Sequence, residues 1–259
     1  ISNDSRYKRI MKDLQIIGTR FITQGLHVHI GIDDCEKVIK VNNGLRIYLP
    51  LLLALTTSSP FYEGIDTGLY SYRTKIFESL PLAGLPDYLD NWNHFINLTD
   101  NLMKANVIKS VKDLWWETRP HPGFGTVEVR ICDVPINFNI ILALVALIQA
   151  LVVTLQNTNK LPNTHIQILE SNKWQAARYG LEGTFIDPLS LKQLSIRNAI
   201  ESLCELVEPK MVSLESAKYI KVLDEILSKG DGATIKREMY NSSGSFEHMI
   251  RSLKEQFYQ

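Results

Sequence analysis

The amino-acid sequence predicts an α+β fold in which helices cover one face of a sheet and a polar cavity lies on the other. In the stretch GLHVHIGIDD, aliphatic residues alternate with His27 and His29. In GTVEVRICD they alternate with Glu128 and Arg130. Residues two apart in a strand point to the same face, so each stretch predicts a strand with one apolar and one polar face. Long helical patterns separate the two strands, which favours the α+β class.

Composition excludes several classes of function. The 259 residues are 45% hydrophobic and 22% charged, as in ordinary globular proteins. Lys+Arg and Asp+Glu are equal at 28 each, so neither nucleic acid nor a membrane surface is an expected partner. Cys35, Cys132 and Cys204 form no Cys-x-x-Cys pair, which disfavours a thiolate zinc site. An odd number of scattered cysteines suits a reducing compartment, and we expect a cytoplasmic protein.

The remaining elements follow from periodicity and from turn residues. The predicted strands are 24–31 and 125–132, and the predicted loops are 58–74, 115–125 and 157–164. The predicted helices are 5–22, 33–59, 91–105, a long apolar helix from Asn137, 171–180, and two or three amphipathic helices within 190–259 with a connection near 241–245. Pro50 is expected to kink or divide the helix that begins at Asp33.

Two apolar runs require a decision between a buried core and a membrane span. The runs 45–55 and 140–155 are both shorter than the roughly 20 residues that cross a bilayer, and Gln149 interrupts the second. Both are therefore interpreted as core helices, and no membrane partner is expected.

The polar residues of the two strands are weak signals when each is taken alone. Paired histidines on a strand are more often exposed or hydrogen-bonded than metal-bound, and a Glu-x-Arg pair is usually a solvated face. Asp33 and Asp34 are interpreted as the start of a helix rather than as ligands.

Taken together, these residues indicate a site for phosphoryl transfer. Imidazole and carboxylate groups can share a Mg²⁺ or Mn²⁺ ion. Arginines in stretches rich in Gly, Pro or aromatic residues can bind carboxylates or phosphates through two nitrogens. The arginines of this kind are Arg73, Arg119, Arg130 and Arg178. A metal ion with several arginines suits phosphoryl transfer, although the chain has no G-x-x-x-x-G-K-[ST] motif.

Four ordered stretches resemble one family: GLHVHIGIDD, LLLALTTSSPFYEGIDTGLYSYRTKIF, RPHPGFGTVEVRICDVP and NKWQAARYGLEG. They resemble the carboxylate–amine ligases of the glutamate–cysteine ligase type 2 family, whose fold is similar to the catalytic domain of glutamine synthetase, with an antiparallel sheet. The resemblance implies an ATP-dependent ligase of glutathione biosynthesis. It would form γ-glutamylcysteine from glutamate and cysteine through a γ-glutamyl phosphate. The family tendency also suggests a homo-oligomer.

The resemblance assigns roles to eight residues of this chain. His27 and Glu128 would bind the Mg²⁺ or Mn²⁺ ion, and His29 would approach the nucleotide phosphates. Arg119 and Arg130 would face the transferring phosphoryl group. The other assignments are Arg73 for the α-carboxylate of glutamate, and Arg178 with Trp174 for the wall of the nucleotide site.

One departure from the family leaves alternatives open. The family's first segment carries a Glu-x-Glu strand with further metal carboxylates, and this chain has no Glu-x-Glu and begins at Ile1. We therefore expect residues 1–259 to form a single catalytic domain, equivalent to the C-terminal two-thirds of the family's domain. The alternatives are a non-catalytic relative that binds metal or an amino acid, and a ligase or kinase that acts on a different amine. Because Glu128 lies on a polar face, its substitution by Gln is expected to cause a large loss of turnover with little loss of fold.

Overall fold

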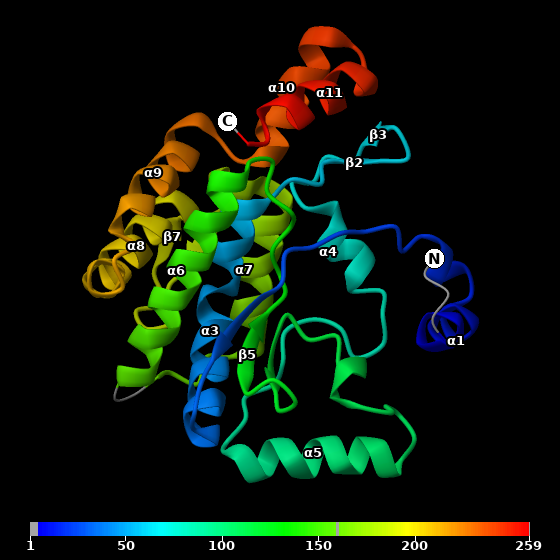
Figure 1. Cartoon of the computed structure of the whole chain (residues 1–259), viewed down its shortest axis with the longest axis vertical. Coiled ribbons are helices and arrows are strands. Elements are labelled where there is room, and N and C mark those ends of the chain that lie inside the picture. The colour runs from blue at the N-terminus through cyan, green and yellow to red at the C-terminus, as the bar shows by residue number, and fades with distance from the viewer. Residues whose placement is uncertain (1–4, 159–160, 259) are drawn as a thin grey trace.

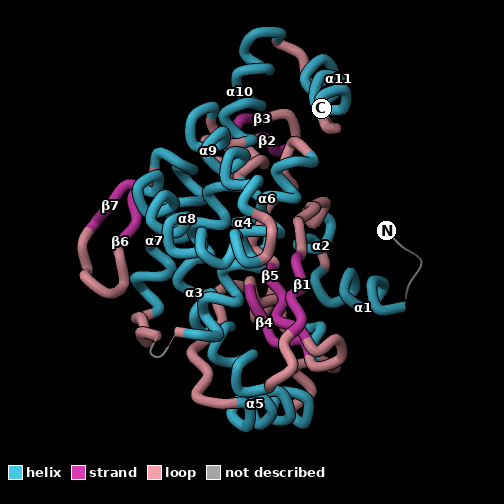
Figure 2. The backbone as a smooth tube through the Cα atoms, turned by 60° about the vertical axis from the view of Figure 1, so that its left-hand side comes forward, coloured by secondary structure: helices cyan, strands magenta, loops and turns pink. Residues whose placement is uncertain are grey.

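A central antiparallel sheet confirms the predicted α+β class. The computed structural model describes residues 5–158 and 161–258. Within these residues, a three-stranded sheet has the strand order β1–β5–β4 (Figure 2). Its strands are β1 Val28–Gly31, β4 Thr118–His121 and β5 Thr126–Val129. Two small hairpins pair β2 Phe61–Tyr62 with β3 Ile65–Asp66, and β6 Thr184–Ile186 with β7 Gln193–Ser195.

Helices pack on one side of this sheet and also lie at both ends of the molecule. Figure 1 shows α3 in the middle of the molecule, α5 across one end, and α10 with α11 at the other end. The α-helices are α1 Ser5–Leu14, α2 Ile16–Thr19, α3 Cys35–Thr56, α4 Tyr72–Phe77, α5 Trp92–Lys104, α6 Phe138–Asn157, α7 Ile166–Tyr179, α8 Ile196–Ser213, α9 Ile220–Lys229, α10 Gly232–Ser243 and α11 Phe246–Gln256.

The central helix α3 begins where the sequence predicts. The Asp34 side chain accepts a hydrogen bond from the backbone N–H of Lys37 and so caps the first turn. Pro50 does not divide the helix, because α3 continues to Thr56, and the alternative of a kink at Pro50 stays a prediction. Pro50 lies inside the core among fully buried leucines, and their packing offsets the hydrogen bond that proline cannot donate.

The apolar face of the sheet packs on the helices. Val28, Val127 and Val129 are buried in one cluster with residues of α3 and α6. The sheet also lies next to α3 through Thr118 of β4, whose hydroxyl donates to the side-chain oxygen of Asn42. The opposite face carries the histidines, Glu128 and the arginines. The sheet therefore has the predicted arrangement, with helices on one face and polar side chains on the other.

Two helices are longer than their apolar runs. By length and composition, α3 with 22 residues and α6 with 20 are each able to cross a membrane. The prediction that the two apolar segments are too short to span a bilayer was therefore wrong. In α3, 89% of the apolar window is buried inside the protein, and in α6 the share is 50%. The apolar sequence of α3 is thus accounted for by its central position. One side of α6 packs against α3 and α8.

Several boundaries differ from the prediction for local physical reasons. The helix predicted over 5–22 is interrupted at Gln15, whose φ of 52° lies outside the helical region. Strand β4 lies in a predicted loop, because the sequence TRPH has no aliphatic alternation and the strand exists through pairing with β5. The C-terminal region has four helices, α8 to α11, rather than two or three. The predicted loop 157–164 lies partly outside the described residues.

The apolar face makes a first prediction. Val129 is fully buried, so Val129→Asp places an unpaired charge in the core. We expect a loss of unfolding free energy of more than about 4 kcal/mol, measured by urea denaturation. The matched control is Val107→Asp at a position that is 54% exposed, where the change is expected within about 0.5 kcal/mol. Equal stability of the two variants would contradict the assignment of the apolar face.

Candidate active site

A row of three polar side chains crosses the sheet. The antiparallel register places Glu128 of β5 opposite His29 of β1 and opposite Arg119 of β4. Directly opposed side chains lie about 5 Å apart, so residues far apart in the sequence meet on this face. His27 and Arg130 lie just beyond the strand ends and join the same group through contacts with Glu128.

Glu128 is the centre of this group. Its carboxylate accepts a hydrogen bond from Arg119 Nε at 2.8 Å on Oε2 and from an Arg130 terminal nitrogen at 2.6 Å on Oε1. The residue is only 2% exposed. Burial opposes its ionisation, but the attraction of Arg130 and Arg119 outweighs burial and holds the pKa of Glu128 below its usual value. One buried carboxylate thus keeps two guanidinium groups together.

The two histidines approach the same carboxylate oxygen. His27 Nδ1 and His29 Nε2 are each 3.4 Å from Glu128 Oε1. Burial, with the charge of Arg130 next in importance, lowers the pKa of His27 to about 4. His27 is therefore a neutral imidazole at physiological pH, the form that binds a metal ion. The other ring nitrogen of His29 lies 3.0 Å from the Thr126 hydroxyl, which fixes the orientation of that ring.

This donor set fits part of a divalent-ion site. His27 and His29 each lie 3.4 Å from the same oxygen of Glu128, which also accepts a hydrogen bond from Arg130. Within residues 5–158 and 161–258, no three His, Cys, Asp or Glu side chains form a complete metal site. Mg²⁺ is typically bound by one or two carboxylates together with water and substrate phosphates, so a partial protein set is compatible with that ion.

Arg73 is held rigidly at the edge of the same group. Its two terminal nitrogens donate to the carbonyl oxygens of Ile131 and Arg130 at 2.9 and 3.0 Å. Gly25 lies against the flat guanidinium, where a Cβ atom would collide with three of its atoms. The guanidinium is therefore fixed before any ligand arrives, which lowers the entropic cost of binding a carboxylate.

Asp133 is a positioning residue that the sequence reasoning missed. It is 1% exposed, lies on the same segment as Arg130, and is 3.7 Å from Arg73. Its carboxylate accepts hydrogen bonds from the Ser59 hydroxyl at 2.7 Å and the Ser71 hydroxyl at 3.0 Å. The backbone N–H of Ser58 donates to it at 3.0 Å. Asp133 thus joins the strand that carries Glu128 to the segment that precedes Arg73.

A cavity of about 460 Å³ opens onto this group. Its polar wall is formed by His27, Arg73 and Arg130, beside Gly25. Its opposite wall is apolar and comes from α1, α4 and neighbouring segments. The apolar lining residues are Ile10, Met11, Leu14, Phe21, Phe77, Leu80 and Trp115. The structure therefore brings Arg73, Arg130 and His27 to one open cavity.

Trp174 and Arg178 lie elsewhere, on α7. The Lys75 ammonium is 4.9 Å from the centre of the Trp174 ring, and Trp174 is 46% exposed. Arg178 donates to the carbonyl of Gly68 and stacks on its neighbour Tyr179. The contacts of these two residues are thus with the segments around Gly68 and Lys75 rather than with His27 or Glu128.

Lys173, next to Trp174 on α7, is a buried lysine that is 1% exposed. Its ammonium is 2.7 Å from Glu117 and 3.0 Å from Glu78, and these carboxylates raise its pKa despite burial. The backbone N–H of Arg130 in turn donates to the backbone carbonyl oxygen of Glu117 at 2.7 Å. Lys173 therefore helps to fix the backbone position of Arg130 through Glu117. No local sequence signal distinguishes a buried lysine from an exposed one.

His121 is a further residue on the polar face. It lies two positions after Arg119 in β4, so alternation could have found it once β4 was recognised. Its ring stacks on Phe124 at 4.3 Å and meets His29 edge to face at 5.7 Å. Burial lowers the pKa of His121, with Arg119 the next cause, so this imidazole is also neutral.

Comparisons with known proteins identify the family of the chain. The sequence model of glutamate–cysteine ligase family 2 (GCS2) matches residues 1–256. A "putative glutamate–cysteine ligase 2" of Gloeobacter violaceus is 40% identical over 253 residues, which cover 96% of this chain and 68% of that protein. A protein of the same name from Solibacter usitatus is 37% identical, over 98% of this chain and 67% of that protein. The chain thus spans about two-thirds of the length of these relatives.

A solved structure shows the same fold. The crystal structure of a glutamate–cysteine ligase from Francisella tularensis in complex with AMP superposes with a TM-score of 0.61. The match covers 97% of this chain and 61% of that chain at 13% identity. The structural match shows the shared fold, and the family match gives the class of carboxylate–amine ligase. The chain belongs to glutamate–cysteine ligase family 2, whose members are ATP-dependent ligases that form a carbon–nitrogen bond.

The contacts of Glu128 change the expectation for its substitution. Glu128→Gln leaves two buried arginines beside a neutral amide, so the fold itself is expected to lose stability, by about 3 kcal/mol. Urea denaturation measures this change. The control is Glu247→Gln, which removes an exposed pair with Arg251 and should cost less than about 0.5 kcal/mol. An unchanged stability of Glu128→Gln would show that the buried pairs add nothing to the fold.

Proposed function

We propose that this chain carries the glutamate and phosphoryl-transfer sites of a ligase that forms γ-glutamylcysteine from glutamate, cysteine and ATP. The observation that supports the proposal is the convergence of Arg73, Arg130 and His27 on one cavity beside Glu128. Family membership supports the coarser class of carboxylate–amine ligase. In the same proposal the protein is cytoplasmic and homo-oligomeric, and residues 1–259 belong to one catalytic domain.

In the first step, the side-chain carboxylate of glutamate attacks the γ-phosphorus of ATP, and ADP leaves. Arg73 binds the α-carboxylate through the rigid guanidinium described above, which orients the side chain toward the phosphate. Arg119 and Arg130 neutralise negative charge that develops on the transferring group. His29 lies beside these arginines and contributes to phosphate binding.

Glu128 and His27 are the residues that would hold a Mg²⁺ or Mn²⁺ ion in this proposal. When bound, such an ion supplies positive charge beside the phosphate oxygens. The neutral state of His27 and the ionised state of Glu128 are the protonation states that ligation requires.

In the second step, an amine nitrogen attacks the carbonyl carbon of the γ-glutamyl phosphate, and inorganic phosphate leaves. Removal of water from the site protects the acyl phosphate from hydrolysis. The apolar wall of the cavity, with Phe77 and Trp115, supports this role.

The decisive test is release of ADP by the full-length protein with ATP, Mg²⁺, glutamate and a panel of amines. Stimulation by cysteine, with γ-glutamylcysteine as the product, is the expected result. Stimulation by another amine alone would replace cysteine in the proposal. Binding of glutamate with no ADP release from any amine would identify a non-catalytic relative instead.

Gly25 provides a selective test of the glutamate site. Gly25→Ala inserts a methyl group into the space of the Arg73 guanidinium, and we expect the KM for glutamate to rise about tenfold or more with the KM for ATP little changed. Gly31→Ala is the matched control in β1, because no atom lies within 4 Å of its added Cβ. Similar glutamate KM values for both variants would remove Arg73 from the glutamate site.

A further inference from the structure

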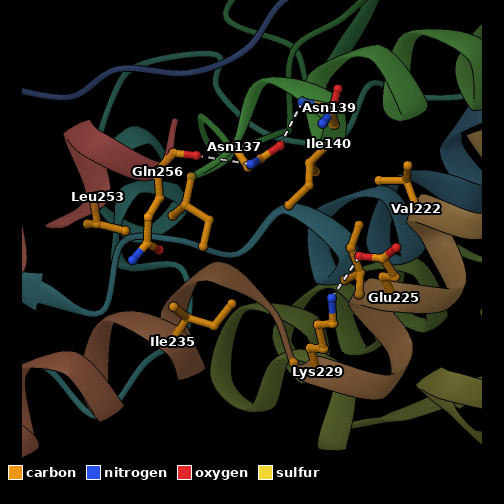
Figure 3. A pocket seen from close by; sticks show the side chains of 12 residues that line it. Asn137, Asn139, Ile140, Val222, Glu225, Lys229, Ile235, Leu253 and Gln256 are labelled. Carbon is orange, nitrogen blue, oxygen red and sulfur yellow. Dashed lines mark hydrogen bonds and ion pairs between the residues drawn. The ribbon is translucent and has the colours of Figure 1, made fainter. Parts of the chain in front are cut away.

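The C-terminal helices α10 and α11 are attached to the body of the protein at two places. The backbone N–H of Phe138, at the start of α6, donates to the carbonyl of Phe257 at 2.8 Å. Asn137 donates from its side chain to the carbonyl of Gln256 at 3.2 Å (Figure 3). At the start of α10, the backbone N–H of Ala233 donates to the carbonyl of Thr57 at 2.9 Å. The helix pair is therefore anchored at both of its ends.

From this position α10 holds the segment 57–71, which we call the 57–71 loop. Lys236 Nζ donates to the carbonyl of Ser58 at 2.5 Å. Arg237 binds both carboxylate oxygens of Asp66, at 2.9 and 2.7 Å, and also donates to the carbonyl of Leu69 at 2.8 Å. The loop lies beside α10 in Figure 1, where β2 and β3 mark it.

The same guanidinium also stacks on the loop. Arg237 lies 4.8 Å from the centre of the Tyr70 ring. Two nitrogens on one carboxylate, a third contact to a carbonyl and an aromatic face together fix the Arg237 side chain in a single position. A lysine could supply the charge but not this planar geometry.

Helix α7 holds the loop from its other side. The backbone N–H groups of Tyr70 and Ser71 both donate to the carbonyl of Ala177, at 2.8 and 3.0 Å. Arg178 donates to the carbonyl of Gly68. The loop is thus fixed between α7 and α10.

The loop leads directly to Arg73. The N–H of Tyr72 donates to the carbonyl of Ser59 at 3.0 Å, and the N–H of Arg73 donates to the Ser59 hydroxyl at 3.1 Å. The hydroxyl groups of Ser59 and Ser71 also donate to the Asp133 carboxylate. A displacement of the loop therefore moves both the backbone of Arg73 and the carboxylate beside its guanidinium.

We propose that α10 is a brace for the glutamate site, with Arg237 and Lys236 as positioning residues that act on Arg73 through the 57–71 loop. This inference rests on the proposed function for the identity of the ligand of Arg73. Displacement of a bound group by about 1 Å can cost two orders of magnitude in rate, so a brace outside the cavity can control the site.

The test compares Arg237→Ala with Arg251→Ala in the full-length protein. Arg251 lies on α11 and makes an exposed pair with Glu247, so its loss removes one arginine without touching the loop. Two quantities are measured: backbone hydrogen exchange over residues 57–73, and the affinity for glutamate beside the affinity for ATP. For Arg237→Ala we expect faster exchange in this segment and glutamate binding weakened by about tenfold, with ATP binding changed less than twofold.

Asp66→Ala extends the test. If Arg237 acts largely through Asp66, the double variant should weaken glutamate binding little more than Arg237→Ala alone. Arg237→Lys should give an intermediate effect, because it keeps the charge and loses the planar fork.

The outcomes separate the brace from the proposed function. Unchanged exchange over 57–73 in Arg237→Ala would overturn the brace. Faster exchange with unchanged glutamate affinity, or an equal loss of ATP and glutamate affinity, would also overturn it. If the unaltered protein binds ATP but no glutamate, the proposed function fails, and with it the role of the brace in that site.

Discussion

The polar face of the sheet depends on one buried carboxylate. Arg119 and Arg130 project from neighbouring strands, and without an anion between them their charges would repel in a region with little water. Glu128 neutralises both and positions them. An anion that enters the cavity therefore meets Arg130 and Arg73, whose orientations are already determined by their contacts.

A second buried carboxylate, that of Asp133, fixes the positions of further residues along the same segment. Asp133 follows Glu128 and Arg130 in the sequence. Its carboxylate accepts hydrogen bonds from Ser58, Ser59 and Ser71. The strand that carries Glu128 is thus linked to the segment that carries Arg73. Two carboxylates on one short segment therefore set the relative positions of Arg130 and Arg73.

The helices complete the site from outside. Lys173 of α7 binds Glu117 behind Arg130, and Arg237 of α10 binds Asp66 in the 57–71 loop. Neither residue lines the cavity. The fold therefore places these two supporting charges on helices outside the cavity, whereas His29, Arg119 and Glu128 lie on the sheet.

The sequence by itself determined the α+β class, the two faces of β1 and β5, the Asp34 cap of α3 and the family. Each depends on a pattern within a few residues or on ordered motifs. Only the tertiary structure decided that the faces bearing His29 and Glu128 converge, because pairing register is a long-range property. It also decided the existence of β4 and the roles of Asp133, Lys173 and Arg237. These roles arise from contacts with residues up to 171 positions away in the sequence, and local periodicity contains no information about such contacts.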